Sequence, residues 1–376
     1  MDEHRLYLDD PNRISPFSKA IAEVVKPGDV VLDLASGTGI LGLMACRAGA
    51  ARVYSIEVGG MVEVVRAVAK ANGYGDRVVA IKGFSTHVDL PEKVDVLVAD
   101  QIGNFGFNAG VLAYFADARQ RFLKPSAVTI PARLDLCLAA VQSEQLYDQV
   151  EFWDKSPGGF DFHSVRVLAA NTGYQANLEP SWIVSDIGTL PPIDLCHASM
   201  QAIEGDAVLK IQRNAMLHGL GGWFTAELSP GVSMTNSPLS EQRIQRRQVF
   251  FAIDQPVSVD RGDTVRVRMK ILPGDLLVNW NVDVFDGPGG AKKTSFRHST
   301  WKAMLLTKEE MERSRPDFFP KLTPRGIGRR TVVELCDGTR PLKEIEDEVF
   351  QRHPELFPSR TDAAVFVAEV VTRYTE

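Results

Sequence analysis

Three glycines and one glutamate form the clearest chemical pattern in the sequence. Gly37, Gly39 and Gly42 lie in "VVLDLASGTGILG", between a β-rich run and a helical run. Glycines in this arrangement let the backbone turn tightly and approach a bound ligand. Glu57 closes the next β-rich run, where its carboxylate can accept hydrogen bonds from a ribose diol. The pattern indicates NAD or S-adenosylmethionine as a cofactor, and a structural glycine turn without a ligand stays open.

A second candidate site is the loop "ADQIGNFGFNAG", residues 99–110, which follows the run "VDVLVAD". Open α/β enzymes hold their reacting substrate at the carboxyl ends of strands. Asp100 is the candidate for orienting an acceptor or accepting its proton, although a strand-end acid can also bond its own loop. Asn104 and Asn108 are candidates for substrate contact or for turn formation. His218, in "LHGLGG", either faces the pocket from a later strand or packs within its own domain.

The elements that must position these residues alternate between β-rich and helical from about residue 26 to residue 131. The runs "DVVLDLA", "RVYSIE", "RVVAIKG" and "KVDVLVAD" are short and rich in Val, which is typical of buried strands. Between the second and third runs, apolar residues recur at helical spacing at Met61, Val64, Val65 and Val68. The pattern predicts a Rossmann-like α/β domain with a parallel sheet over residues 1–131.

The pattern then changes twice along the chain. After "FLKPSAVTIPA", alternating strands separated by Gly and Pro turns predict an antiparallel, barrel-like β domain over residues 132–311. A Pro-rich stretch, "RSRPDFFPKLTPRG", leads to short amphipathic helices that form a third domain, residues 312–376. One predicted helix face holds Leu342, Ile345 and Val349. Another holds Phe366, Val367, Val370, Val371 and Tyr374.

Composition limits the class of protein. With 376 residues the chain is long enough for two or three domains, and 44% hydrophobic with 24% charged residues is ordinary for a soluble globular protein. A net charge of −6 argues against a general nucleic-acid or membrane binder. The N-terminus "MDEHRLYLDD" is acidic and no apolar run reaches about 18 residues, so we expect a cytoplasmic location. Four scattered cysteines without C-x-x-C spacing signal neither a metal site nor a disulfide framework.

The glycine loop resembles that of the class I methyltransferases, because Asp33 precedes "ASGTG" and "SIE" ends the second strand. Along most of the chain the sequence is similar to the protein arginine methyltransferase family. The matching segments include "YLDDPNRISPFSKAI", "GTGILGLMACRAGAARVYSIE", "IKGFSTHVDLPEKVDVLVAD", "FLKPSAVTIPARL" and "VEFWDKSPGGFDF". The resemblance implies S-adenosylmethionine as cofactor, S-adenosylhomocysteine as product, and a homodimer formed through an arm near residues 147–180.

The same resemblance implies which residues bind the cofactor. In this family an arginine of the N-terminal helix binds the methionine carboxylate, and Arg13 stands at that position. The segment that ends near residue 100 reaches the adenine. The full set implied is Arg13, Asp33, Ala35, Gly37, Gly39, Glu57, Val58, Phe84, Ser85 and Asp100.

The acceptor region departs from the family. Members carry two glutamates in the loop after the fourth strand, whereas here Asp100 stands at the first position and Ala109 at the second. Arg243-Ile244-Gln245 replaces the family's Thr-His-Trp segment, and a cation there would repel a guanidinium. We therefore predict an altered pocket that methylates a peptide or a natural-product intermediate on N or O. The alternatives are a true arginine N-methyltransferase that uses Asp100 alone, and a scaffold that has lost catalysis.

The C-terminal segment "LCDGTRPLKEIEDEV" resembles the helical part of PqqD-like domains, the peptide-recognition elements of ribosomal-peptide biosynthesis. The resemblance implies capture of a leader peptide by the tail, which would raise the effective concentration of the acceptor to the millimolar range. A generic helical extension that packs on the preceding domain is the alternative.

Overall fold

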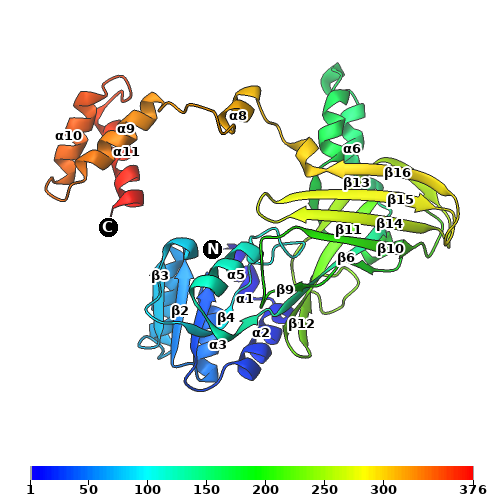
Figure 1. Ribbon diagram of the computed structural model, residues 1–376, viewed down its shortest axis with the longest axis horizontal. Coiled ribbons are helices and arrows are strands. Elements are labelled where there is room, and N and C mark those ends of the chain that lie inside the picture. Colours follow the sequence, from blue (N-terminus) through cyan, green and yellow to red (C-terminus); the bar gives the residue numbers. More distant parts are fainter. Residues whose placement is uncertain (1, 376) are drawn as a thin grey trace. The chain divides into compact units, whose positions relative to one another are not determined.

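The computed structural model describes residues 2–375 and divides into two compact units, Met1–Met304 and Leu305–Glu376 (Figure 1). The first unit contains an N-terminal α/β part and a sheet-rich part. Among its described residues, the second unit contains helices and no strands. Within residues 2–375, no helix combines the length and the apolar character needed to cross a membrane.

The α/β part is built on a five-stranded parallel sheet with the order β3-β2-β1-β4-β5. Each strand predicted from the sequence is present. The strand β1 is buried at every position, as expected when helices cover both faces of a parallel sheet. The order reverses between β1 and β4, so the carboxyl ends of these two strands border the crevice in which such folds bind ligands. The strands are β1 (Val30–Leu34), β2 (Arg52–Glu57), β3 (Val78–Lys82), β4 (Val94–Val98) and β5 (Leu123–Ile130).

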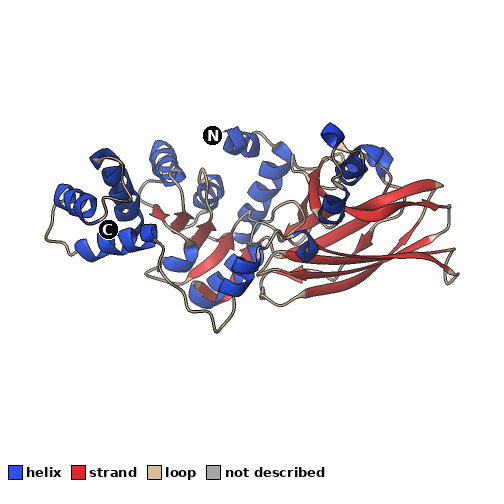
Figure 2. Ribbon diagram, turned by 90° about the horizontal axis from the view of Figure 1, so that it is seen from above, coloured by secondary structure: helices blue, strands red, loops and turns tan. Residues whose placement is uncertain are grey.

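Helices surround this sheet, as Figure 2 shows by the blue ribbons around the shorter red strands. The helix predicted from Met61 onward is α4, and its fully buried residues are Val62, Val65 and Ala69. The predicted face is therefore rotated slightly, because Val64 and Val68 lie at its partly buried border. The helices of this part are α1 (Asp2–Leu8), α2 (Pro11–Val24), α3 (Ile40–Ala48), α4 (Met61–Ala71) and α5 (Val111–Arg121).

The sheet-rich part consists of two antiparallel sheets. One has seven strands, with β7-β13-β11-β6-β8 in line and β9 and β12 paired at its sides, and the other has the order β10-β14-β15-β16. The antiparallel prediction is confirmed. The predicted barrel is not confirmed, because no hydrogen-bonded ladder closes the two sheets within residues 2–375. Side chains join them instead: the Trp280 indole donates to the carbonyl of Ala252 on the facing sheet at 3.0 Å.

The strands of the seven-stranded sheet are β6 (Arg133–Val141), β7 (Gly173–Ala176), β8 (Gly188–Thr189), β9 (Ile193–Asp194), β11 (Ala215–Ser229), β12 (Val232–Thr235) and β13 (Gln248–Val259). Those of the four-stranded sheet are β10 (Ile203–Lys210), β14 (Thr264–Leu272), β15 (Leu277–Phe285) and β16 (Lys292–Ser299).

A helical insertion separates β6 from β7 in the region predicted to form an arm. Its helices are α6 (Glu144–Glu151) and α7 (Arg166–Ala170), with short 3-10 turns between them (Figure 1). The Tyr147 hydroxyl fastens the insertion to β13 by donating to the carbonyl of Asp254 at 2.7 Å. Phe160, in the middle of the insertion, is 70% exposed.

The C-terminal unit has its own core between three helices, α9 (Pro324–Leu335), α10 (Leu342–Arg352) and α11 (Arg360–Tyr374), after a short α8 (Lys308–Arg313). Ile345 and Val349 are buried as predicted. Leu342 and Tyr374 are exposed, which corrects the prediction that they share the buried faces. Each lies at a helix end, beyond the reach of this small core.

Candidate active site

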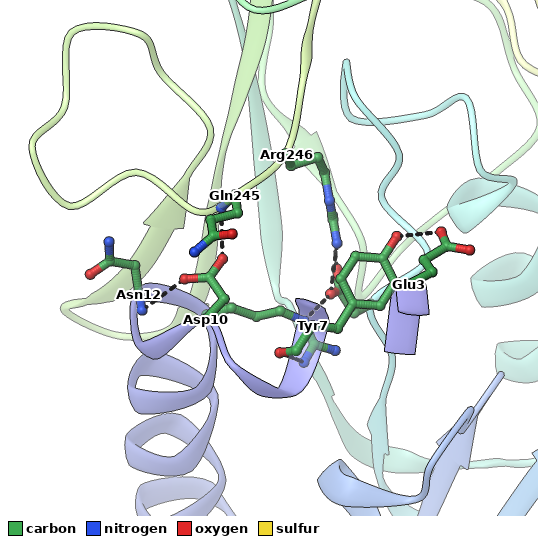
Figure 3. A network of polar contacts seen from close by, with 8 residues as sticks. Glu3, Tyr7, Asp10, Asn12, Gln245 and Arg246 are labelled. Atoms are coloured by element: carbon green, nitrogen blue, oxygen red, sulfur yellow. Dashed lines mark hydrogen bonds and ion pairs between the residues drawn. The ribbon is translucent and has the colours of Figure 1, made fainter. Parts of the chain in front are cut away.

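A cavity of about 390 Å³ opens at the carboxyl ends of β1 and β4. The glycine loop, the loop after β4 and the two N-terminal helices line it, and Arg246 enters from the segment between β12 and β13. Figure 3 shows the polar network at this place, with Arg246 directed toward Tyr7 and with Asp10 bonded to Gln245. The sequence-predicted residues Arg13, Ala35, Gly37, Glu57 and Asp100 are thus brought together.

The glycine loop has the geometry that its residue types require. Gly39, with φ of 78°, adopts the left-handed conformation in which a side chain is strained. Gly42 packs so closely that an added Cβ would lie 2.9 Å from Asp33 Oδ2. The Gly42 amide donates to that same oxygen at 2.9 Å, which ties the first turn of α3 to β1.

Glu57 holds the loop from the end of β2. Its two carboxylate oxygens accept from the backbone amides of Gly37 and Gly59, each at 2.9 Å. An ionised carboxylate has about four acceptor positions, so these two bonds orient Glu57 and leave capacity for a diol.

An adjoining cavity of about 130 Å³ shares Ala35, Glu57 and Gln101 with the first. Val58 and Phe84 lie on its wall and are 50% and 55% exposed, so they offer apolar surface to a planar group. Ser85 also lines it. The two cavities together form a path from the glycine loop to the end of β3.

Three buried oxygens have no hydrogen-bond partner within residues 2–375: Asp33 Oδ1, Ser36 Oγ and Ser85 Oγ. Ser36 lines the larger cavity and Ser85 the smaller, whereas Asp33, in β1, lines neither. Buried polar groups in folded proteins are nearly always paired, so such atoms call for a ligand or water. Burial raises the pKa of Asp33 to about 7, against the opposing effect of the Gly42 amide. This site suits a polar nucleoside cofactor such as S-adenosylmethionine. It offers unpaired oxygens, free acceptor positions on Glu57 for a diol, and the apolar surface of Val58 and Phe84 for a planar group.

Asp100 is held between two arginines at the floor of the larger cavity. Its Oδ2 accepts from Arg13 Nε at 2.6 Å and from Arg246 Nη2 at 2.9 Å, and its Oδ1 accepts from Arg246 Nη1 at 3.0 Å. Burial alone would raise the pKa of Asp100, but Arg246 and then Arg13 outweigh it and hold the pKa below its usual range. Asp100 is therefore an ionised, hydrogen-bonding group and a weak base.

The prediction that Arg243 is the cation near the pocket requires a correction. Arg243 points elsewhere, since its guanidinium donates to the carbonyl of Pro238 at 2.9 Å. Arg246, three residues later, is the arginine that lines the cavity. Gln245 reaches the N-terminal helices through its backbone, because its amide donates to Asp10 Oδ2 at 2.7 Å. Ala109 lines the cavity, so no carboxylate comes from that position.

The structure places the three other candidates, Asn104, Asn108 and His218, differently. Asn104 lines the cavity. Asn108 instead holds its own loop, with Oδ1 accepting from the Asn104 amide at 2.9 Å. His218 does not face the cavity: it is 4% exposed, its Nδ1 accepts from the Ser143 amide, and its ring packs near Tyr147. A register shift in β11 lies between Leu217 and Gly219, on either side of His218.

Several lining residues were not predicted from the sequence. Glu3, His4 and Tyr7 come from α1, and Gln101 follows Asp100. The segment "EHRLYL" does carry helical spacing, because Glu3 and Tyr7 stand four residues apart and their side chains bond at 2.8 Å. Arg246 lies in an irregular segment without periodicity, so no local pattern indicated it.

Comparison with known proteins bears on this geometry. The family model for the arginine methyltransferase oligomerization subdomain matches residues 132–282, and that for ribosomal protein L11 methyltransferase (PrmA) matches residues 18–132. Protein arginine N-methyltransferase 1 of Chlamydomonas reinhardtii is 30% identical over 283 residues, which cover 72% of this chain and 80% of that protein. The chain belongs to the protein arginine N-methyltransferase family.

Other family members agree. Arginine N(omega)-methyltransferase of Streptomyces achromogenes subsp. streptozoticus is 28% identical over 275 residues, or 71% of this chain and 75% of that protein. The Trypanosoma brucei PRMT1 enzyme-prozyme heterotetrameric complex with AdoHcy matches in fold, with a TM-score of 0.69, 24% identity and coverage of 78% and 97% of the two chains. This member of the arginine methyltransferase family is thus an enzyme that uses S-adenosylmethionine.

Proposed function

We propose that the protein transfers a methyl group from S-adenosylmethionine to a guanidino nitrogen of arginine. The observation that carries the proposal is the Asp100 carboxylate, which grips the Arg246 guanidinium through both terminal nitrogens at 2.9 and 3.0 Å. A buried anion with this fork-like geometry is suited to a guanidinium. The printed names of the relatives, which are arginine methyltransferases, support this acceptor over the altered pocket that we favoured from the sequence.

The chain's own residues act mainly by placement. The cofactor supplies an electrophilic methyl group on a sulfonium, and an acceptor nitrogen needs only to lie in line with it. Alignment of this kind can lower a barrier by about 7–11 kcal/mol. Asp100 would orient the acceptor and stabilise its positive charge, while the depressed pKa of Asp100 makes water the better destination for the released proton.

A second carboxylate faces the same cavity and bears on the missing family glutamate. Glu3 lines the cavity together with Ala109, and the Tyr7 hydroxyl donates to Glu3 Oε1 at 2.8 Å. Glu3 is proposed to supply, from α1, the negative charge that Ala109 lacks.

The test of the acceptor proposal is the isosteric change Asp100→Asn. Transfer of labelled methyl to L-arginine and to an arginine peptide should fall by roughly 10²–10³-fold, the usual loss for a single charge-stabilising group. Asp117→Asn, on α5 and outside the cavity, is the matched control. Calorimetric titration with S-adenosylhomocysteine would establish that the variant is folded. Undiminished transfer by Asp100→Asn would refute the proposal.

One observation favours a different acceptor. Arg13 and Arg246 both line the cavity, so a carboxylate on a peptide or natural-product intermediate would find cationic partners there. A methyl ester, unlike a methylated guanidine, is released as methanol by mild base. Base-labile label transferred to an acidic acceptor, with none on arginine, would select this second function.

The helical insertion and the tail suggest how the enzyme assembles and recruits its acceptor. Phe152, Phe160 and Phe162 are exposed on the predicted arm, and a homodimer would cover them. Light scattering should therefore report a dimer, and Phe160→Asp should weaken it.

The separate core of Leu305–Glu376 is compatible with capture of a leader peptide by a PqqD-like domain, so a precursor peptide should bind this tail.

A further inference from the structure

We propose that Arg246 is an internal competitor for the acceptor site and thereby determines which acceptors the enzyme uses. The inference rests on the proposed transfer to a guanidino nitrogen. In the structure, the guanidinium of Arg246 occupies the place on Asp100 that an incoming guanidinium needs. An acceptor must displace it before methyl transfer.

The hydrogen-bonding capacity of Asp100 leads to this requirement. Three of about four acceptor positions on its carboxylate are taken, two by Arg246 and one by Arg13. A second guanidinium cannot form a two-point pair with the single position that remains. Release of Arg246 frees two positions and also removes a cation that would repel the acceptor.

The surroundings of the Arg246 guanidinium show that a guanidinium fits this pocket. The side chains of Arg246 and Asp100 are only 9% and 7% exposed. The guanidinium carbon lies 5.7 Å from the ring centre of Tyr7 and 5.9 Å from that of Phe224. Such distances permit cation–π attraction, so the two rings and the carboxylate together define a guanidinium site.

The backbone around Arg246 is fixed, while its side chain borders the cavity of about 390 Å³. Ile244 is buried, and the Gln245 amide is bonded to Asp10. On the other side, the carbonyl of Arg247 accepts from the Asn236 side chain at 2.8 Å. Displacement therefore requires rotation of one long, flexible side chain within the cavity that it lines, and leaves the loop in place.

This arrangement has a consequence for selectivity. The apparent affinity for an acceptor falls by the fraction of molecules in which Asp100 is open. Free arginine and extended acceptors lose affinity by the same factor. An acceptor with further contacts elsewhere on the enzyme therefore still binds at concentrations at which free arginine no longer does.

The experiment compares Arg246→Met with the matched control Arg243→Met, in which a nearby arginine that bonds to Pro238 is removed by the same change. Both proteins are saturated with S-adenosylhomocysteine, and binding of L-arginine and of acetyl-Gly-Arg-Gly-amide is measured by calorimetry. Arg246→Met should bind both probes roughly tenfold more tightly than wild type. Arg243→Met should match wild type, and all three proteins should bind S-adenosylhomocysteine alike.

Binding that is unchanged or weaker in Arg246→Met, in a protein that still binds S-adenosylhomocysteine, overturns the inference and makes Arg246 a supporting part of the site. Should Arg246→Met not fold, Arg246→Lys takes its place, since it keeps the charge but forms only a one-point contact. For the inference to stand, Arg246→Lys must bind both probes more tightly than wild type, by less than about tenfold. Absence of methyl transfer to arginine despite tighter binding would instead refute the proposed function and leave the competition intact.

Discussion

The cofactor side and the acceptor side of the cavity differ in how their polar atoms are used. On the cofactor side, Asp33, Ser36 and Ser85 each keep a buried oxygen without a partner in the described chain. On the acceptor side, Asp100 has both oxygens bonded to arginines, and Asn108 is bonded to its own loop. The first side is ready for a ligand, whereas the second is closed on itself.

This difference teaches that the two ligands face different energetic requirements. A cofactor would gain hydrogen bonds to Ser36 and Ser85 that the ligand-free protein does not make. However, Arg13, the expected partner of its carboxylate, is bonded to Asp100. On the proposed function, a guanidinium acceptor must first break the buried ion pair between Asp100 and Arg246, and buried charges are costly to leave unpaired. The family's cofactor chemistry is therefore visible in the geometry, while its acceptor chemistry is visible only through the internal guanidinium of Arg246.

The largest expected effect concerns the cofactor side. Glu57→Ala should weaken S-adenosylhomocysteine binding by roughly 10²–10⁴-fold, because two hydrogen bonds to a charged group are lost, each of about 1.5–3 kcal/mol. The orientation of the carboxylate by Gly37 and Gly59 makes these bonds strong. Calorimetry measures the effect. Glu63→Ala, an exposed change on α4, is the control, and equal affinities for the two variants would contradict a cofactor site at Glu57.

A smaller effect should appear in the pH dependence of stability without cofactor. The pKa of Asp33 is raised by burial to about 7, so the folded protein holds a proton that the unfolded chain, with a pKa of about 3.9, releases between these pH values. Stability should therefore decline as pH rises from about 4 to 7. Asp33→Asn removes this decline.

Thermal denaturation at pH 5 and pH 8 tests the sign. The wild type should lose a few °C more than Asp33→Asn between the two conditions, since about 1 kcal/mol corresponds to roughly 2–4 °C in chains of moderate size. Asp76→Asn, which changes an exposed carboxylate, should behave as wild type. Parallel curves for all three proteins would show that Asp33 is ionised throughout.

A severalfold change in the KM for the acceptor is expected when Glu3, which lines the cavity, is altered. Glu3→Gln should raise the KM for an arginine acceptor about fivefold, in line with a partly exposed charge pair of about 1 kcal/mol. Ala109→Glu in the same protein should restore the KM, because it returns a carboxylate to the other wall of the cavity. Steady-state kinetics with saturating cofactor measures both. A rise in KM that Ala109→Glu leaves uncorrected would assign Glu3 a role through Tyr7 alone.

The sequence predicted the cofactor side better than the acceptor side for a physical reason. The strands, the glycine loop and Glu57 follow from short-range patterns, because tight turns and buried strands restrict residue types locally. Arg13 and Asp100 followed from the family resemblance. Arg246 could not be predicted, since its position depends on an irregular segment pinned by Asp10, far away in the sequence. For His218 the alternating pattern left two placements open, and the structure shows that its ring packs near Tyr147 within its own domain.

The smallest expected effect is that of removing the tail on cofactor binding and on methylation of free arginine. All the residues that line the cavity lie in Met1–Met304, and the tail has a separate core. A chain ending at Met304 should therefore bind S-adenosylhomocysteine and methylate free arginine within about twofold of the whole chain, the scatter expected for distant, independent sites. For a peptide recruited through the tail, the same truncation should raise the KM by 10²-fold or more, through loss of effective concentration.

The full-length variant Val349→Asp provides the control, because it places a charge in the tail core while the linker remains. It should reproduce the truncation for the peptide and leave free arginine unaffected. Loss of activity on free arginine in both proteins would mean that the tail contributes to the catalytic side itself. Loss in neither assay would leave the tail without a role in recruiting the acceptor, and the selectivity of the enzyme would then rest on the cavity and on Arg246.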